Sequence, residues 1–270
     1  MGSEMCIRDR AHMDEVGLMV TDITSDGYLK FDEVGGIDRR VLPGKRVCVG
    51  RNGLNGVIGV KPIHLTNGDE KTAVPKMNDM YIDIGAESRE DALKYVNYGD
   101  SINFEGDFKI NGKTVVTKAL DDRFGCYVLI NLIKSEPEYD MYFTFVVQEE
   151  VGLRGARPAA FTVNPDFALV IESTTAADVA EVDASHQVCN LSKGATVTVM
   201  DRATVYDKEM ISAAFELAEK NNIAVQYKRA VAGGNDSGAI HQSRGGVRTL
   251  AVSLLSLIHI SEPTRPLYIS

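Results

Sequence analysis

The segment Met141–Gly155, MYFTFVVQEEVGLRG, joins an apolar run directly to two adjacent carboxylates, Glu149 and Glu150. The run Met141–Val147 is typical of a strand buried in a sheet. Two like charges this close raise each other's proton affinity, so something has to hold both in place. A bound cation would do so, with one glutamate as a ligand and the other moving protons on an activated water. Alternatively, the strand ends in solvent with two exposed acids, and the pair alone does not choose between these interpretations.

The residues around this segment predict an α/β fold. Apolar strands alternate with helices along the chain after residue 108, which indicates a sheet covered by helices on both faces. The expected strands are Lys113–Lys118, Met141–Val147, Phe167–Ile171, Ala195–Met200, Ile223–Tyr227 and Val247–Leu254. The expected helices follow Asp121, lie around Leu153–Phe161, extend from a cap at Asp207 to about Asn221, and extend from a cap at Asp236 to about Gln242.

Residues 17–105 show a different pattern. Short strands such as Gly17–Ile23 and Val57–Val60 are separated by turn pairs that include Pro43-Gly44 and Asn52-Gly53. Strands at this spacing with glycine-rich turns predict a small β-barrel or sandwich. One helix is expected at Glu87–Val96. We therefore predict a catalytic α/β domain in residues 11–17 and 106–254, with a small β-barrel domain in residues 18–105 inserted near its start.

Composition limits the classes of partner. The chain has 270 residues, 44% of them hydrophobic, and a formal charge of -9, as in a globular protein of one or two domains. This charge argues against nucleic acid or an anionic membrane as the main partner, because phosphate binding needs a basic surface. The longest apolar stretches, such as Leu250–Ile260, are too short to span a membrane. The four cysteines form no Cys-x-x-Cys pair, so a cytoplasmic location without disulfides or a sulfur zinc site is expected.

Both ends of the chain lack the patterns of the rest. Residues 1–10, MGSEMCIRDR, show neither a signal peptide nor a strand or helix with a usable apolar face. Residues 255–270 likewise follow no period. Both ends resemble translated sequencing-adapter sequence, with a tag or a natural disordered tail as the alternative. We therefore expect the biological sequence to extend from about Ala11 to about Leu254.

Imidazole and acidic side chains recur where predicted strands end, which is where open α/β sheets place their sites. His12 and Asp14 form a His-x-Asp motif, in which the imidazole could bind metal while the carboxylate orients a ligand or a base. Asp121 lies between a strand and a helix and could bridge two metal ions. An aspartate in that position is more commonly a helix N-cap.

Glu172 follows the buried strand Phe167–Ile171, where an ionised side chain needs a partner. Together with His12, Asp121 and the Glu149-Glu150 pair, it gives a set of oxygen and imidazole groups at strand ends. Such groups suit zinc, cobalt or manganese. No single one of these residues is decisive.

Seven motifs occur in order along the chain: AHMDEVG, GGIDRRVLPGKRV, GVIGVKPIHL, ALDDRFG, VQEEVGLRGA, VMDR and GGNDSGAIHQSRGGV. In this order they resemble metallopeptidase family 42, the glutamyl and tetrahedral aminopeptidases, some of which are labelled cellulases. The resemblance extends over nearly all of Ala11–Leu254. The resemblance implies a zinc-peptidase-like catalytic domain, with a mixed sheet flanked by helices, and two divalent ions, zinc or cobalt with manganese as a further option.

The resemblance also implies a role for each residue. The metal ligands would be His12, Asp121, Glu150 and Glu172, with Asp121 bridging the two ions. Glu149 would be the general base, and Asp14 would support His12. Asp236, in a glycine-rich turn, would lie near the substrate, although it could equally be a plain helix cap. The remaining histidines are interpreted as structural or surface residues: His64, His186 and His241.

Two departures from the family limit this comparison. The family has a helix and strands before the His12 motif, so we expect the N-terminal part of the catalytic domain to be missing. It also has a terminal histidine after the last strand. Here the adapter-like end supplies His259 at nearly the same distance, and we do not interpret His259 as a true ligand.

The function implied by the resemblance is a dinuclear metal-dependent aminopeptidase of short peptides. The ions would activate a water, Glu149 would take its proton, and the hydroxide would attack the first peptide carbonyl. Self-assembly is also implied, with tetrahedral dodecamers in the best-known members. A glycoside hydrolase with paired carboxylates is an alternative, but it would not need His12 and Asp121, and the chain has no tryptophan for a sugar platform. A catalytically dead fragment that keeps only the fold is the other alternative.

Overall fold

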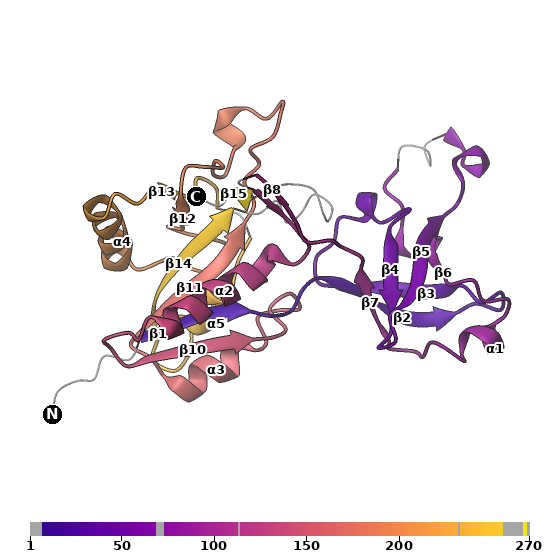
Figure 1. Ribbon diagram of the computed structural model, residues 1–270, viewed down its shortest axis with the longest axis horizontal. Helices are drawn as coiled ribbons and strands as arrows, with labels where there is room; N and C mark the ends of the chain where they lie inside the picture. The colour runs from indigo at the N-terminus through magenta and orange to yellow at the C-terminus, as the bar shows by residue number, and fades with distance from the viewer. Residues whose placement is uncertain (1–6, 69–72, 113, 232, 256–266, 269–270) are drawn as a thin grey trace. The chain divides into compact units, whose positions relative to one another are not determined.

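The structure is a computed structural model that describes residues 7–68, 73–112, 114–231, 233–255 and 267–268. It divides into two compact units (Figure 1). One unit contains residues 7–15 and 109–255, and the other is Val16–Phe108. The first is built on a sheet with helices and the second on a closed barrel. The predicted α/β fold with an inserted β-barrel is confirmed.

The main sheet of the first unit, called the sheet unit below, has six strands in the order β10-β1-β11-β14-β12-β13. Parallel pairing joins the first four strands, which are β10 (Met141–Val146), β1 (Ile7–His12), β11 (Phe167–Thr174) and β14 (Arg248–Leu255). Beyond them, β12 (Ala195–Val197) is antiparallel to β14 and parallel to β13 (Val225–Tyr227). The sheet is therefore mixed, as predicted.

Helices cover both faces of this sheet. Helix α2 (Leu120–Lys134) packs its Leu129 against Ala11 and Ile171 on one face. The opposite face is covered by α3 (Ala156–Val163), α4 (Lys208–Lys220) and α5 (Ser237–Ile240). Successive side chains of a strand point to opposite faces, so β11 serves both layers. Helix α4 begins where the sequence predicts, since the Asp207 carboxylate accepts from the Met210 backbone N–H at 2.9 Å.

A small sheet of short strands also belongs to this unit. It pairs β8 (Lys109–Asn111) with β9 (Thr114–Val116), and β9 with β15 (Leu267–Tyr268). A 3-10 turn, η5 (Ala184–His186), lies between β11 and β12.

The barrel unit closes in the order β2-β3-β6-β5-β4-β7. Its strands are β2 (Gly17–Ile23), β3 (Leu29–Val34), β4 (Arg46–Val49), β5 (Leu54–Val60), β6 (Met80–Asp83) and β7 (Ser101–Phe104). Among the described residues, the 3-10 turns between these strands are η1 (Arg39–Val41), η2 (Ile63–Leu65) and η4 (Met77–Asp79). Helix α1 (Arg89–Ala92), capped by Ser88, is shorter than the expected Glu87–Val96. The barrel encloses an apolar core of its own, which includes Leu18, Phe31 and Ile82.

One sequence prediction is wrong. Residues 1–10 were expected to hold no strand, yet β1 begins at Ile7 and lies between β10 and β11. The backbone N–H and C=O groups of two neighbouring strands hold this segment, so it is extended although Arg8, Asp9 and Arg10 give no apolar period. Residues 1–6, 256–266 and 269–270, which include His259, lie outside the described residues, and the predictions for them stay predictions.

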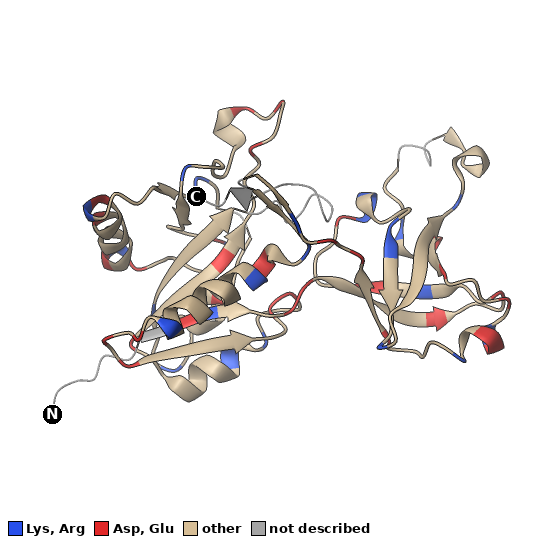
Figure 2. Cartoon of the chain, viewed as in Figure 1, with Lys and Arg blue, Asp and Glu red and all other residues tan. Residues whose placement is uncertain are grey.

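Charged side chains are spread over both units (Figure 2). Among the described residues, the lysines and arginines form no continuous basic stripe in this view, in agreement with the net charge of -9. Within the same residues, no helix has the length and apolar character that a membrane span requires.

Candidate metal centre

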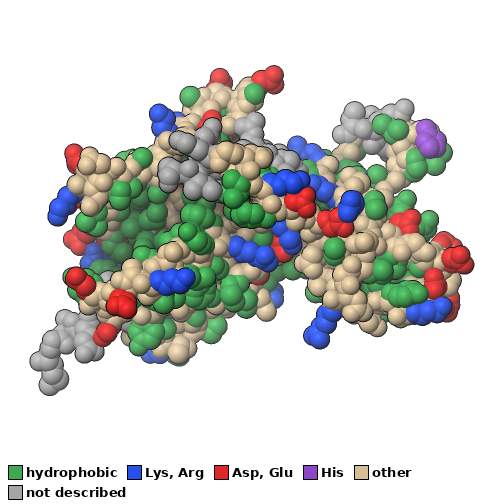
Figure 3. Space-filling view, viewed as in Figure 1, with side chains coloured by type: hydrophobic (Ala, Val, Ile, Leu, Met, Phe, Trp, Pro, Cys, Tyr) green, Lys and Arg blue, Asp and Glu red, His purple; other side chains and the backbone are tan. Residues whose placement is uncertain are grey.

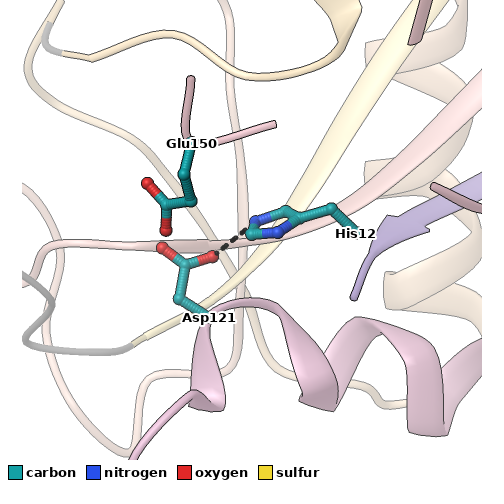
Figure 4. A group of neighbouring side chains, drawn as sticks. All are labelled: His12, Asp121 and Glu150. Carbon is teal, nitrogen blue, oxygen red and sulfur yellow. Dashed lines mark hydrogen bonds and ion pairs between the residues drawn. The ribbon is translucent and has the colours of Figure 1, made fainter. Parts of the chain in front are cut away.

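The centre is built around His12, the last residue of β1, whose side chain is buried. The Nδ1 atom of the ring lies 3.0 Å from the backbone oxygen of Asp14, and the Nε2 atom lies 3.1 Å from Oδ1 of Asp121 (Figure 4). Donation from Nδ1 to a carbonyl directs Nε2 toward the carboxylates, as in metal-binding histidines. Burial alone would lower the pKa of His12, but hydrogen bonds to Asp121 and Asp14 raise it. A metal ion at Nε2 would replace the proton that Asp121 stabilises there.

Two groups of possible ligand atoms share this imidazole. The first is His12, Asp121 and Glu150, and the second is His12, Asp122 and Glu172. Within each group, one ligand atom per residue lies within 4.8 Å of the others. The structure therefore brings together all four ligands predicted from the sequence, and adds Asp122.

Asp121 and Asp122 are the first two acidic residues of α2, and their side chains make different contacts. Asp121 and Asp122 have non-helical backbone angles inside the helix. The Asp122 carboxylate accepts from the Gly125 backbone N–H at 3.1 Å, so Asp122 caps the regular part of the helix. Asp121 makes no such bond among those found in the described residues and extends toward His12 instead. Sequence reasoning missed Asp122, although the doubled aspartate was a signal that one residue caps while the other reaches the site.

Glu149 and Glu150 follow β10, and their backbone is fixed by Asp14. The Asp14 carboxylate accepts from the N–H of Glu149 and from that of Glu150, each at 3.2 Å. The Glu149 side chain is only 12% exposed, and its Oε2 lies 4.0 Å from Nε2 of His12. The alternative of two solvent-facing acids is therefore not what the structure shows. Asp14 holds His12 through its carbonyl and the glutamate pair through its carboxylate.

The carboxylates of the centre share an excess of buried negative charge. The pKa of Glu149 is raised to about 8, mainly by burial and also by the neighbouring acids Asp236, Glu150 and Asp121, against the lowering effect of His12. Burial, assisted by Asp121, raises the pKa of Glu150 to about 7. Glu172 and Asp122 are raised well above their ordinary pKa by burial. Buried carboxylates of this kind, with an imidazole among them, fit a divalent cation.

Asp236 lies directly before α5 and is buried beside Arg10, with its Oδ2 atom 3.1 Å from Nε of Arg10. Its side chain makes no capping hydrogen bond to the helix, so the plain helix-cap interpretation is not supported. The predicted contact with substrate stays a prediction. The other histidines that the structure describes lie in η2, in η5 and at the end of α5, and none joins either ligand group: His64, His186 and His241.

The sequence model of one protein family, M42 glutamyl aminopeptidase, matches residues 3–262. The chain belongs to the M42 glutamyl aminopeptidase family. A relative from Acetivibrio thermocellus is 42% identical over 246 residues, which cover 90% of this chain and 72% of that protein. The glutamyl aminopeptidase of Lactococcus lactis subsp. cremoris is 31% identical, over 91% of this chain and 71% of the enzyme.

Solved structures give the same result. The TET1 peptidase of Pyrococcus horikoshii, described as assembling into a tetrahedron or a large octahedral shell, superposes with a TM-score of 0.84 at 38% identity. That match covers 99% of this chain and 80% of the peptidase chain. M42 proteins are metal-dependent hydrolases of the aminopeptidase class, and the predicted enzyme class is confirmed.

Proposed function

We propose that this centre removes N-terminal residues from short peptides with two divalent ions, zinc or cobalt with manganese as a further option. His12, Asp121, Glu150 and Glu172 would hold the ions. The observation that supports this proposal most directly is the pair of ligand groups that share the His12 imidazole. Asp122 falls within the second group and would help to fix it.

Glu149 is the proposed general base. When bound, the ions would lower the pKa of a water and polarise the peptide carbonyl. Glu149 faces His12 without belonging to either ligand group, so its carboxylate is available to take the proton of that water. A carboxyl group in this largely buried position can take a proton from the water and pass it to the leaving amine. The Asp14 carboxylate fixes this position through the Glu149 backbone.

The test compares two glutamine substitutions. We expect Glu149→Gln to keep its metal, about two ions per chain by mass spectrometry, and to lose turnover of aminoacyl anilides by about 10³-fold. Glu216→Gln, at an exposed position of α4, should keep both its metal and its turnover. Comparable turnover in Glu149→Gln would refute the assignment of the base.

The same assays separate the alternatives. A metal-loaded parent chain that cleaves cellulose, and not aminoacyl anilides, would favour a glycoside hydrolase. A chain that folds but binds no metal would be a fold-only fragment. Chelator-sensitive cleavage of the anilides, restored by adding the ion back, supports the proposed peptidase.

We also propose that the chain assembles with copies of itself, as the Pyrococcus horikoshii relative does. Light scattering after size-exclusion chromatography would give the number of chains, and a monomer at all concentrations would reject this part. A cytoplasmic location stays a prediction from cysteine usage. Cys48, Cys126 and Cys189 are free thiols, which is compatible with that location.

A further inference from the structure

A hydrogen-bond network joins two of the sequence motifs, VMDR and GGNDSGAIHQSRGGV, within the sheet unit. Asp201, the aspartate of VMDR, is buried. Its Oδ1 atom accepts from the backbone N–H groups of Ala203 and Thr204, both at 2.8 Å. Its Oδ2 atom accepts from the hydroxyl of Tyr206 at 2.6 Å, and Tyr206 is buried too. Burial and the hydrogen bond to Asp201 raise the pKa of Tyr206, so the hydroxyl keeps the proton that it donates.

The same hydroxyl reaches the turn that leads into α5. It accepts from Nδ2 of Asn235 at 3.1 Å, and Oδ1 of Asn235 accepts from the backbone N–H of Ser237 at 2.8 Å. The backbone oxygen of Asn235 also accepts from the N–H of Gly238 at 2.9 Å. Asn235 is itself buried, and a buried amide that loses such a partner is left unsatisfied. Tyr206 therefore fixes the first residues of α5 from outside that helix.

The start of α5 packs in turn against the loop that carries Glu149. A Cβ atom placed on Gly238 would lie 2.8 Å from Cβ of Ala203 and 3.3 Å from Cδ1 of Leu153, so the Gly238 backbone lies directly against both side chains. The N–H groups of Gly152 and Leu153 both donate to the backbone oxygen of Glu149, each at 2.9 Å. Leu153 therefore connects the start of α5 to the backbone of Glu149.

We propose that Tyr206 is a positioning residue for Glu149. Its hydroxyl binds Asp201 and Asn235, and the start of α5 held in this way supports Leu153 and the loop that carries Glu149. The inference rests on the proposed function, because it takes Glu149 as the base. Small displacements of a reacting group cost large factors in rate. Without the hydroxyl, Asp201 and Asn235 each lose a buried hydrogen-bond partner, so the contact with Leu153 loosens.

The first test compares Tyr206→Phe with Tyr227→Phe in the full chain. Both substitutions remove one hydroxyl, and Tyr227 is a half-exposed residue of β13. Hydrogen exchange followed by mass spectrometry would report on the peptide 148–155, which contains the two amides that donate to Glu149. We expect these amides to exchange about fivefold faster in Tyr206→Phe and at the parent rate in Tyr227→Phe. Unchanged exchange in Tyr206→Phe would overturn the inference, because its role would then end at the 201–206 turn.

Kinetics separate positioning of the base from support of substrate binding. With saturating Co²⁺, we expect Tyr206→Phe to lower kcat for an aminoacyl anilide by about tenfold and to leave KM within about twofold of the parent value. The base would be displaced while the anilide still binds. An unchanged kcat in Tyr206→Phe, whatever the value of KM, would overturn the inference.

A second pair of variants covers the case in which Tyr206→Phe fails to fold. Gly238→Ala removes no side-chain partner from the network, but its Cβ would lie only 2.8 Å from Cβ of Ala203. Gly234→Ala, in the same motif, would meet that atom at an ordinary 3.8 Å. We expect faster exchange of the peptide 148–155 in Gly238→Ala and not in Gly234→Ala, with circular dichroism confirming that both are folded. Equal exchange in the two variants would overturn the inference.

The outcomes distinguish this inference from the proposed function. If Glu149→Gln loses turnover while Tyr206→Phe changes neither exchange nor kcat, the assignment of the base stands and the inference fails. If Glu149→Gln keeps its turnover, or the parent chain has none, the proposed function fails and the inference fails with it.

Discussion

Asp9 places a carboxyl group in the apolar layer between β1 and α2. It shares one side of β1 with Ala11, which packs against Leu129 and Ile171. Asp9 is buried, and neither of its carboxylate oxygens finds a hydrogen-bond partner within the described residues. This desolvation raises the pKa of Asp9 from 3.8 to about 6. At neutral pH the folded chain therefore holds an unpaired buried charge, which opposes folding.

We predict that Asp9→Val stabilises the fold and changes its pH dependence. Because the folded pKa is higher than the unfolded one, the protonated carboxyl favours the folded state below pH 3.8, and this contribution is lost as pH rises through about 6. The difference between the two pKa values corresponds to about 3 kcal/mol. Urea unfolding followed by circular dichroism should show a decline in stability between pH 4 and 7 that is smaller by about this amount in Asp9→Val than in the parent chain, because the other buried carboxylates contribute to the decline in both.

A surface aspartate provides the control for this experiment. Asp140→Asn changes an exposed carboxylate in the turn before β10, so its pH profile should follow that of the parent. A decline of equal size in Asp9→Val would assign the pH dependence to other groups.

Gly125 leaves room for the carboxylate of Asp122, which lies three residues earlier in α2. A Cβ atom at Gly125 would lie 2.4 Å from both oxygens of Asp122, too close for any side chain. We predict that Gly125→Ala displaces Asp122 from the second ligand group and weakens Co²⁺ binding by about tenfold, as expected when a group supporting a metal site is moved. Gly36→Ala is the matched control, because a Cβ there meets nothing within 4 Å. Unchanged Co²⁺ affinity in Gly125→Ala would show that Asp122 has no part in the centre.

At the scale of strands and helices, the sequence predicted those elements whose own residues carry an apolar run or a cap. The strands β10, β11 and β14 lie within a few residues of the predicted ranges, and α4 begins at its predicted cap. These elements carry their signal in consecutive residues, as an apolar run or a capping aspartate.

Elements and contacts that depend on distant partners could not be predicted in this way. The start of β1 has charged residues but is held by pairing with β10 and β11. The ion pair of Arg10 with Asp236 joins residues far apart in the sequence, and no local period indicates it. The candidate ligands were found because each follows or begins an element, whereas the capping bond of Asp122 requires knowledge of where the helix becomes regular.

The edge strand β10 is the element most exposed to unwanted pairing. In the described part of the sheet it has a neighbour on one side only, and MYFTFV contains no charge and no proline. Uncharged edges of this kind tend to pair with other chains. Apolar side chains also gather over the visible face of this unit (Figure 3), and α2 exposes Tyr127, Ile130 and Ile133.

We therefore predict that Tyr142→Lys, at a position 52% exposed in β10, reduces association of the chain during heating. A lysine on an edge strand disfavours pairing because its charge would have to be desolvated. Static light scattering at constant protein concentration measures the effect. Tyr139→Lys adds the same charge just before the strand and should have less influence. Equal effects of the two substitutions would indicate that net charge, rather than the strand edge, controls association.

At the scale of the whole molecule, metal binding would stabilise one of the two units and not the other. The barrel unit has its own apolar core, which includes Leu18, Val47 and Ile102. Every proposed ligand, from His12 to Glu172, belongs to the sheet unit. An ion that binds only the folded state stabilises the unit that holds it by about 2.7 kcal/mol at a concentration of 100 times Kd.

Hydrogen exchange followed by mass spectrometry can measure each unit separately in the intact chain. On adding Zn²⁺ or Co²⁺, we predict slower exchange in peptides from β10 and β11, which flank His12, and unchanged exchange in peptides from β2–β7 of the barrel. A chelator should reverse this slowing of exchange, and His12→Ala should not show it, because that variant lacks the imidazole shared by both ligand groups. Equal protection of the barrel peptides would contradict this prediction, since it would mean that metal binding stabilises both units as one cooperative structure.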